Sequence, residues 1–309
     1  MEKITVVGAG NVGATTAQRL AEKELAREVV MVDVQEGIPE GKGLDQWESA
    51  PVELFDTRVT GSTDYEAAAG SDVFVVTAGI PRKPGMSRDD LLKTNADIVR
   101  NVSSEIARVA PDAVVIMVSN PLDVMCGVAL EATGFPRERV LGMAGILDTA
   151  RYRSFIAMEL DVSVHDIQAL VLGGHGDTMV PLVNYTSVSG IPLRQFLDDE
   201  RIEALVDRTR KGGAEIVSYL KTGSAFYAPS SAAVQMVDAI AHDRKRVLPC
   251  AAQLQGEYGI EGQYLGVPCK LGKGGLHEVV EVALTDDERR DLESSAQAVR
   301  SAMDALAKL

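Results

Sequence analysis

The stretch ITVVGAGNVGATTAQRL, from Ile4 to Leu20, decides the fold. A β-branched run typical of a buried strand leads into Gly8, Gly10 and Gly13, and an alanine-rich segment with helical spacing follows. In this G-x-G-x-x-G spacing, the first glycine allows a tight turn and the second lets the backbone approach a pyrophosphate. The third lets helix and strand pack closely, and the phosphates lie at the helix N-terminus, where backbone amides favour anions. The stretch therefore predicts a dinucleotide-binding unit.

A carboxylate follows the second expected strand at the spacing that this unit requires. The strand Val29–Val32 ends at Asp33, twenty positions after Gly13. A carboxylate there can accept hydrogen bonds from the hydroxyls of the adenosine ribose, although Asp33 could also be a simple turn residue at a strand end. Because a carboxylate would repel a 2′-phosphate, the sequence favours NAD over NADP as cofactor.

Two further strand–helix units continue the pattern. The apolar runs within 71–79 and 113–118 read as buried strands, and Pro121 introduces the helix after the second of them. Continuous apolar strands that alternate with helices indicate a parallel sheet with both faces covered. Ligands bind such sheets at the carboxyl ends of the strands, so the loops that follow the strands are the expected binding site.

The loop at 79–92, GIPRKPGMSRDDLL, is the most basic of these loops. Its prolines and glycines exclude a helix at the start, whereas Ser87 and Asp90 form the pattern of a capping box for the next helix. A lone arginine here would be a solvated surface residue. Two arginines, Arg82 and Arg88, at the ligand-binding edge favour a loop that covers a bound ligand.

The second half carries a different pattern and a candidate proton-transfer group. A helix is expected at 147–162, with Asp148 and Arg151 on one face, either as a local ion pair or with separate functions. A strand at 169–172 then ends in two glycines before His175. An imidazole can exchange a proton near neutral pH, although a lone loop histidine often has no function.

The rest of the chain is expected to form helices at 194–219 and 230–242, glycine-punctuated hairpins within 247–282 and a final amphipathic helix at 286–306. The change of pattern near Met143–Leu147 predicts two domains, a dinucleotide-binding domain at 1–145 and a substrate domain at 146–309.

Composition limits the other functional classes. A formal net charge of −14 argues against nonspecific binding to nucleic acid or to an anionic membrane. No apolar run approaches the ~18 residues of a membrane span, and no leader-like segment precedes the first expected strand. The three cysteines show no C-x-x-C spacing, which indicates buried apolar residues in a reducing compartment rather than disulfides or a metal site. We therefore expect a cytoplasmic protein without a metal.

Taken together, the motifs resemble the lactate/malate dehydrogenase family over essentially the whole chain. They are GAGNVG at 8–13, Asp33, GIPRKPGMSRDDLL at 79–92, VSNPLD at 118–123, LDTAR at 147–151 and GGHGDTMVP at 173–181. The resemblance implies an α/β protein in which an N-terminal Rossmann domain, a doubly wound parallel sheet, precedes an α+β substrate and catalytic domain. It also implies hydride transfer between NAD and a 2-hydroxy acid.

The resemblance assigns roles residue by residue. His175 would accept the proton of the substrate hydroxyl and return it in reduction, while Asp148 would hold its imidazole and stabilise the charged form. Arg151 would bind the substrate carboxylate with a two-pronged fork, Arg88 would polarise the carbonyl, and Asn120 would contact substrate and nicotinamide. The implied cofactor-binding residues are Gly8, Ala9, Gly10, Asn11, Val12, Gly13, Asp33, Asn95, Val118 and Asn120.

Arg82 bears on the choice of substrate. In this family, lactate enzymes carry glutamine at the matching loop position and malate enzymes carry arginine. A cation ~4 Å from the second carboxylate of oxaloacetate contributes up to ~4 kcal/mol at an effective dielectric constant of 20, or about three decades in rate ratio. Pyruvate would leave that cation unpaired. The resemblance therefore implies reversible oxidation of (S)-malate to oxaloacetate.

Two alternative functions stay open. One is oxidation of lactate or another 2-hydroxy acid, against which Arg82 argues. The other is a non-catalytic NAD-binding sensor, which would have no need for His175, Asp148 and Arg151 together.

The resemblance also implies an oligomer of identical chains, since the relatives form dimers and tetramers. We expect a homotetramer, with a homodimer as the alternative. The expected helix at 43–49 carries the single tryptophan, Trp47, which would either face a partner chain or lie buried within one subunit.

Overall fold

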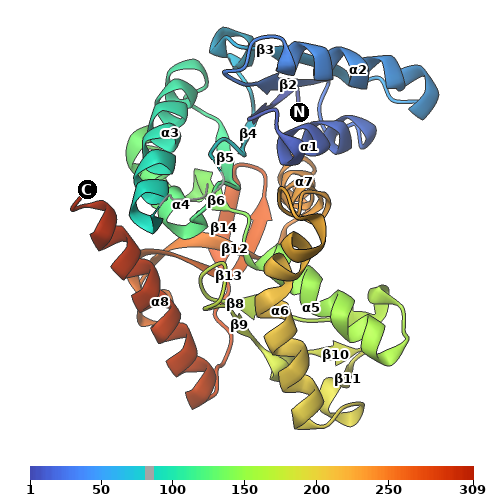
Figure 1. Ribbon diagram of the computed structural model, residues 1–309, viewed down its shortest axis with the longest axis vertical. Helices are drawn as coiled ribbons and strands as arrows, with labels where there is room; N and C mark the ends of the chain where they lie inside the picture. The colour runs from blue at the N-terminus through green and yellow to red at the C-terminus, as the bar shows by residue number, and fades with distance from the viewer. Residues whose placement is uncertain (81–86) are drawn as a thin grey trace.

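The fold is organised around one sheet that runs through both halves of the chain. A computed structural model describes residues 1–80 and 87–309, so Arg82 lies outside the described residues. The sheet has nine strands in the order β14-β13-β12-β6-β5-β4-β1-β2-β3 (Figure 1). Six of them pair in parallel: β1 (Lys3–Val7), β2 (Glu28–Val32), β3 (Arg58–Ser62), β4 (Val73–Val76), β5 (Val114–Met117) and β6 (Val140–Gly142). The expected doubly wound parallel sheet is therefore confirmed.

The strands are apolar throughout because both faces of the sheet are covered. Along β1, Ile4 and Val6 face one hydrophobic core while Val7 faces the other, and the same alternation recurs along β2, β4 and β5. The first core also contains side chains of α1 (Asn11–Glu22), α2 (Ile38–Glu53) and α7 (Tyr227–Ala241). The second contains side chains of α3 (Arg88–Val109) and α4 (Leu122–Thr133). This two-sided burial is what the continuous apolar runs predict.

The C-terminal half extends the same sheet with antiparallel strands. Strand β12 (Arg246–Gln255) pairs with β6 and with β13 (Glu261–Gly272), which pairs in turn with β14 (Gly275–Val279). This half also contains α5 (Gly145–Leu160), α6 (Asp199–Leu220) and α8 (Asp286–Leu306). Its small sheets are formed by β7 (Ile167–Gln168), β10 (Ser187–Val188) and β11 (Ile191–Pro192), and by β8 (Val171–Leu172) and β9 (Val180–Pro181). The expected hairpins and final helix are confirmed, but the strand expected at 169–172 covers only its last two residues.

Short 3₁₀ helices connect several of these elements. They are η1 (Tyr65–Ala68), η2 (Arg137–Arg139), η3 (Val164–Asp166), η4 (Val183–Tyr185), η5 (Leu193–Gln195) and η6 (Glu257–Gly259).

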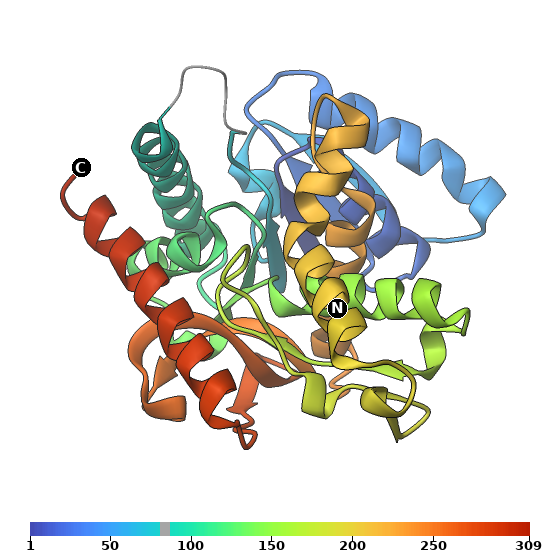
Figure 2. The same ribbon diagram turned by 60° about the horizontal axis from the view of Figure 1, so that its bottom comes forward.

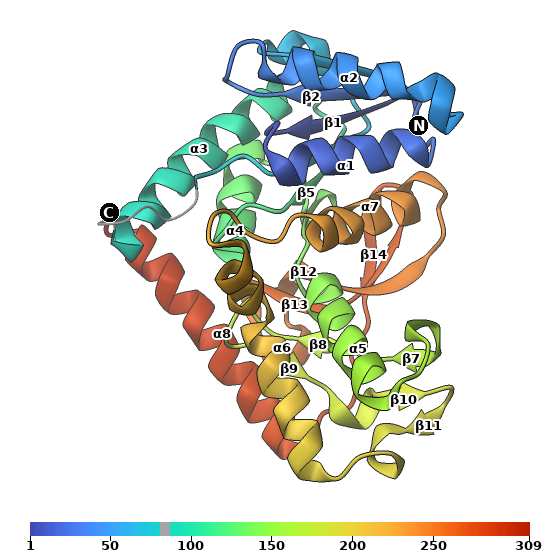
Figure 3. The same ribbon diagram turned by 45° about the vertical axis from the view of Figure 1, so that its right-hand side comes forward.

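Helix α8 belongs to the C-terminal half and packs with its last turns against the N-terminal half. Figures 2 and 3 show it running from the C-terminal half towards the start of α3. There Lys93 Nζ donates a hydrogen bond to the carbonyl of Leu309 at 3.1 Å, and Met303 and Leu306 pack on the core beneath α3 and α4. Among the described residues, no helix has the length and apolar character needed to cross a membrane.

Candidate active site

Two cavities lie at the carboxyl ends of the parallel strands. The first, of about 530 Å³, follows β1, β2 and β4 and is lined by Gly8, Ala9, Gly10 and Asp33, among others. The second, of about 350 Å³, is lined by Val12, Val118, Asn120, Arg151, His175 and Arg210, among others. Because Val12 follows directly on the glycine turn of the first cavity, the two cavities adjoin at the start of α1. We call them the cofactor cavity and the substrate cavity.

The glycine turn has the geometry that its sequence predicts. Gly8 has a φ of +101°, a conformation that favours glycine. A Cβ atom on Gly13 would lie only 1.7 Å from the carbonyl oxygen of Gly8, so α1 can pack on β1 only with glycine there. Gly10 caps α1, and Asn11, Val12 and Gly13 form its first turn. The backbone amides of this turn are therefore available to an anionic group.

Asp33 serves as a turn residue and also braces the glycine turn. Its Oδ2 accepts a hydrogen bond from the backbone N–H of Ala9 at 2.6 Å, and its Oδ1 accepts one from Gln35 at 3.0 Å. The side chain lines the cofactor cavity, so it can accept further hydrogen bonds from a bound ribose. Lys42, which the sequence motifs do not single out, reaches the same cavity from α2 and donates from Nζ to the carbonyl of Ala9 at 2.7 Å.

Asn95 and Asn120 connect the loops that follow β4 and β5. Asn95 Nδ2 donates to the carbonyl of Asn120 at 2.8 Å, and Asn95 Oδ1 accepts from the backbone N–H of Ile80 at 2.9 Å. Asn95 is buried, so its amide holds the two loops together, while Val118 and Asn120 line the substrate cavity. The capping box of Ser87 and Asp90 is present at the start of α3.

Of the two loop arginines, the structure describes Arg88. Arg88 is the first residue of α3 and is exposed, and it is not among the described residues that line the two cavities. Arg82, for which the sequence predicted a place in the site, lies outside the described residues.

His175 is held by a buried carboxylate. Its Nδ1 lies 2.8 Å from Oδ2 of Asp148, a residue of the first turn of α5 that is 1 % exposed. Gly173 and Gly176, with φ of +85° and +128°, shape the loop that presents the ring. Because Asp148 engages Nδ1, Nε2 is the ring nitrogen left for a ligand in the substrate cavity.

The surroundings of His175 favour its protonated form. Burial lowers the pKa of the imidazole, but the charge and hydrogen bond of Asp148, with a contribution from Asp123, outweigh this effect and leave the pKa above its ordinary value. Arg151 opposes them, since its positive charge lowers the same pKa. The ring therefore keeps its proton to a higher pH than a free imidazole does.

Arg151 combines the local ion pair offered by the sequence with a place on the lining of the substrate cavity. Its Nη1 donates to Oδ1 of Asp148 at 3.2 Å, which is the expected local pair, and its side chain also lines the substrate cavity. Helix α6 leaves room for this side chain, because a Cβ atom on Gly212 would lie 3.1 Å from Cδ of Arg151. Adjacent glycines inside a helix cost stability, so Gly212 and Gly213 were a sequence signal for a close approach.

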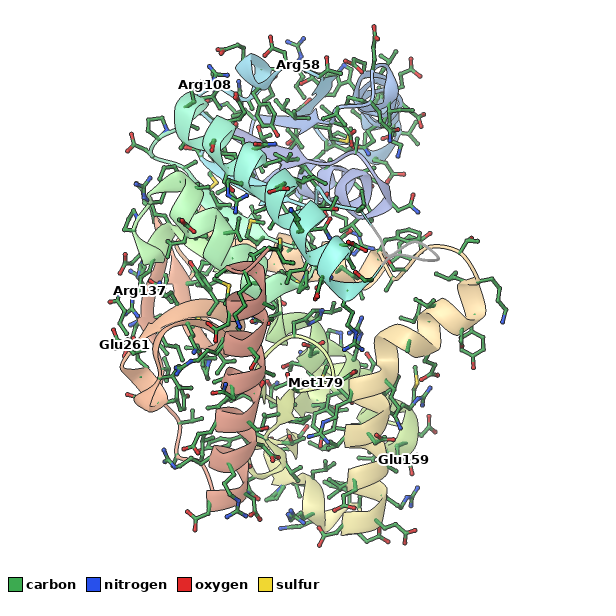
Figure 4. All side chains as sticks on the ribbon, turned by 60° about the vertical axis from the view of Figure 1, so that its left-hand side comes forward. Arg58, Arg108, Arg137, Glu159, Met179 and Glu261 are labelled. Carbon is green, nitrogen blue, oxygen red and sulfur yellow. The ribbon has the colours of Figure 1, made fainter. Side chains whose placement is uncertain are left out.

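Arg210 is a second described cation of the substrate cavity, and the sequence motifs do not single it out. It lies on α6, and its Nε donates to the carbonyl of Met179 at 3.3 Å. Figure 4 shows Met179 beside this helix. Arg210, Gly213 and Val217 line the cavity from one face of α6, a helical spacing that the sequence contained. The described lining of this cavity thus carries two arginines against one carboxylate, Asp177, in a chain of net charge −14. Within residues 1–80 and 87–309, no cluster of His, Cys, Asp or Glu side chains could hold a metal ion.

Comparison with known proteins assigns both halves of the chain to domains of one family. Residues 2–142 match the profile described as lactate/malate dehydrogenase, NAD binding domain, and residues 146–309 match lactate/malate dehydrogenase, alpha/beta C-terminal domain. The malate dehydrogenase of Chloroherpeton thalassium is 62% identical over 298 residues, which is 96% of each chain. That of Pelodictyon phaeoclathratiforme is 59% identical over 99% of each chain.

A solved structure agrees with these relatives. The malate dehydrogenase from Salinibacter ruber superposes with a TM-score of 0.96 at 55% identity, covering 99% of this chain and 98% of that one. Profiles, relatives and fold give the same assignment: the chain belongs to the lactate/malate dehydrogenase family, whose N-terminal domain binds NAD.

Proposed function

We propose that the protein catalyses the reversible oxidation of (S)-malate to oxaloacetate, with NAD as the hydride acceptor. The observation that carries this proposal is the set of groups around one cavity: an imidazole held by a buried carboxylate, and two described arginines. The imidazole suits transfer of a hydroxyl proton, and the arginines suit a substrate with more than one carboxylate. The named relatives are malate dehydrogenases.

In this mechanism His175 moves the proton. Neutral His175 accepts the hydroxyl proton of malate at Nε2, and the carboxylate of Asp148 stabilises the imidazolium that forms. In the reverse direction the protonated ring donates to the carbonyl oxygen of oxaloacetate. The raised pKa of His175 favours this second state before substrate binds.

The arginines orient the substrate. Arg151 gives one nitrogen to Asp148, which fixes the guanidinium and leaves other N–H groups for the substrate carboxylate beside the reacting carbon. Arg82 and Arg88 are proposed to bind the second carboxylate and to polarise the carbonyl, on the resemblance of their loop to the family. Asn120 is proposed to contact the substrate beside the nicotinamide, because it lines the substrate cavity next to His175.

Bound NAD would supply the hydride acceptor for the oxidation of malate. The residues present fit it, because the cofactor cavity combines free backbone amides at the start of α1 with the carboxylate of Asp33. The amides suit the pyrophosphate, Asp33 suits the ribose hydroxyls, and Lys42 adds a positive charge nearby.

One assay tests the proposed function. We expect loss of NADH absorbance to be fast with oxaloacetate, slower by orders of magnitude with pyruvate, and absent without an added acid. A higher kcat/KM with pyruvate would instead indicate a lactate enzyme. NADH binding with no turnover of either acid would indicate a sensor.

Asp33→Asn should weaken the preference for NADH over NADPH. A hydrogen bond to a charged group contributes ~1.5–3 kcal/mol, so we expect KM for NADH to rise about tenfold or more. KM for NADPH should fall, because the charge that repels the 2′-phosphate is gone. The matched control is Asp45→Asn, which removes an exposed carboxylate from α2. An unchanged ratio of kcat/KM for the two cofactors in Asp33→Asn would contradict this role.

We further propose a homotetramer, with a homodimer as the alternative. Trp47 is 39 % exposed in the single chain, so the interpretation that it is buried within one subunit is wrong. Ile38, Leu44 and Val52 of α2 are exposed as well, which supports a contact between copies on this helix. Light scattering during gel filtration distinguishes the assemblies. We also propose a cytoplasmic location, supported by three cysteines that are buried and free.

A further inference from the structure

The loop that presents His175 is held by two side chains, which accept hydrogen bonds from two successive backbone N–H groups. Asp123 Oδ2 accepts a hydrogen bond from the backbone N–H of His175 at 2.9 Å, and Ser295 Oγ accepts one from Gly174 at 2.8 Å. Asp123 comes from the first turn of α4 and Ser295 from α8. Both are buried, so the backbone of the loop is fixed from two separate elements.

The two side chains that hold the loop, Asp123 and Ser295, differ in charge. Ser295 holds Gly174 with a neutral hydroxyl, which costs little to bury. Asp123 is 6 % exposed, and its Oδ1 has no hydrogen-bond partner among the described residues. Burial raises the pKa of this carboxyl to about 6, against the opposing effect of the His175 hydrogen bond and charge. Burying a carboxylate costs more free energy than burying a neutral hydroxyl. The hydroxyl of Ser295 accepts the neighbouring backbone N–H without a charge. This indicates that the charge itself has a use.

His175 lies in a balance of nearby charges. From α5 it faces Asp148 and Arg151, from α4 Asp123, and from α6 Arg210 across the substrate cavity. Asp177, on its own loop, lines the same cavity. Asp148 already shares its charge with Arg151, so Asp123 provides a second buried negative charge that no described cation pairs with.

We propose that Asp123 is a second positioning carboxylate for His175, which fixes the loop through its backbone N–H and stabilises the protonated imidazole through its charge. The proposal rests on the proposed function, in which the protonated ring is the proton donor to oxaloacetate. Asp123 does not contact the substrate in this scheme. It acts through His175 alone.

The test compares Asp123→Asn with Ser295→Ala in the full-length protein. The asparagine keeps an oxygen that can accept from His175 N–H but removes the charge. The alanine removes the hydrogen bond from Gly174 N–H to Ser295 Oγ and leaves every charge in place. We expect Asp123→Asn to lower the pKa of His175 by about 0.5 to 1, read from the ¹⁵N shifts of its ring without ligands. In Ser295→Ala the pKa should stay at the wild-type value. The same pKa in Asp123→Asn and the wild type would overturn the proposal.

Kinetics give a second readout. Reduction needs protonated His175, so kcat/KM for oxaloacetate falls as pH rises through its pKa. If the pKa of His175 is lower in Asp123→Asn, this fall begins at a lower pH. At a pH above the His175 pKa of both proteins, kcat/KM of the variant relative to wild type should be about three- to tenfold lower than it is at low pH. A loss that is the same at every pH indicates a purely structural role and contradicts the charge argument. Wild-type protein without oxaloacetate turnover would instead refute the proposed function, while the NMR titration would still test the coupling.

A measurement on the wild type covers the case in which Asp123→Asn does not fold. With ¹³C-labelled aspartate, the Asp123 carboxyl should titrate near pH 6 and show a further inflection where the His175 ring titrates. Independent titration curves for the two groups would overturn the proposal.

Discussion

Replacement of His175 by asparagine should lower kcat for oxaloacetate reduction by about 10²- to 10⁴-fold, the usual contribution of a general acid. Asparagine occupies a similar volume and can hydrogen-bond to Asp148, but it cannot donate and recover a proton near neutral pH. NADH binding should persist, because the glycine turn and Asp33 line a separate cavity. Stopped-flow turnover and NADH fluorescence titration measure the two quantities independently.

The control for this variant is His165→Asn. His165 is an exposed residue of η3, so its loss changes the histidine content without affecting the substrate cavity. Wild-type turnover is expected. Turnover of the His175 variant within a factor of ten of wild type would show that another group transfers the proton. Loss of NADH binding would show instead that the substitution disrupts the fold.

The sequence could predict the parts of this site that depend on local pattern. The glycine spacing, the apolar strands and the Ser87–Asp90 capping box each follow from interactions within a few residues, and the structure contains them. Strand β3 was missed because it lies at the edge of the sheet, where RVTGS needs no continuous apolar run.

The rest of the site depends on contacts between distant segments. Asp123 and His175 are 52 residues apart, and Ser295 reaches the same loop from 121 residues after Gly174. No local pattern indicates such pairs. Arg210 is an intermediate case, because its helical face was readable but the cavity that this face lines was not. Sequence motifs thus identified the groups proposed to do the chemistry, and the structure added groups that hold or surround them.

The largest expected change in specificity comes from Arg82→Gln. Oxaloacetate carries a second carboxylate, and loss of a cation that binds it at ~4 Å removes up to ~4 kcal/mol, or about three decades in the ratio of kcat/KM for oxaloacetate to that for pyruvate. Pyruvate should gain, because it no longer leaves an arginine unpaired. Arg88 and Arg151 are unchanged in this variant, so binding of the first carboxylate and polarisation of the carbonyl should persist.

The variant Arg210→Gln is the control that tests whether Arg82, and not another arginine, selects the substrate. Arg210 lines the substrate cavity beside Arg151, so it is the described cation that could take the second carboxylate instead. Its guanidinium also donates to Met179, and loss of that bond should affect both substrates alike. If Arg82 selects the dicarboxylate, Arg210→Gln lowers both values of kcat/KM and leaves their ratio within about tenfold of wild type. A larger fall in the ratio for Arg210→Gln than for Arg82→Gln would transfer the selection of the dicarboxylate from Arg82 to Arg210 on α6.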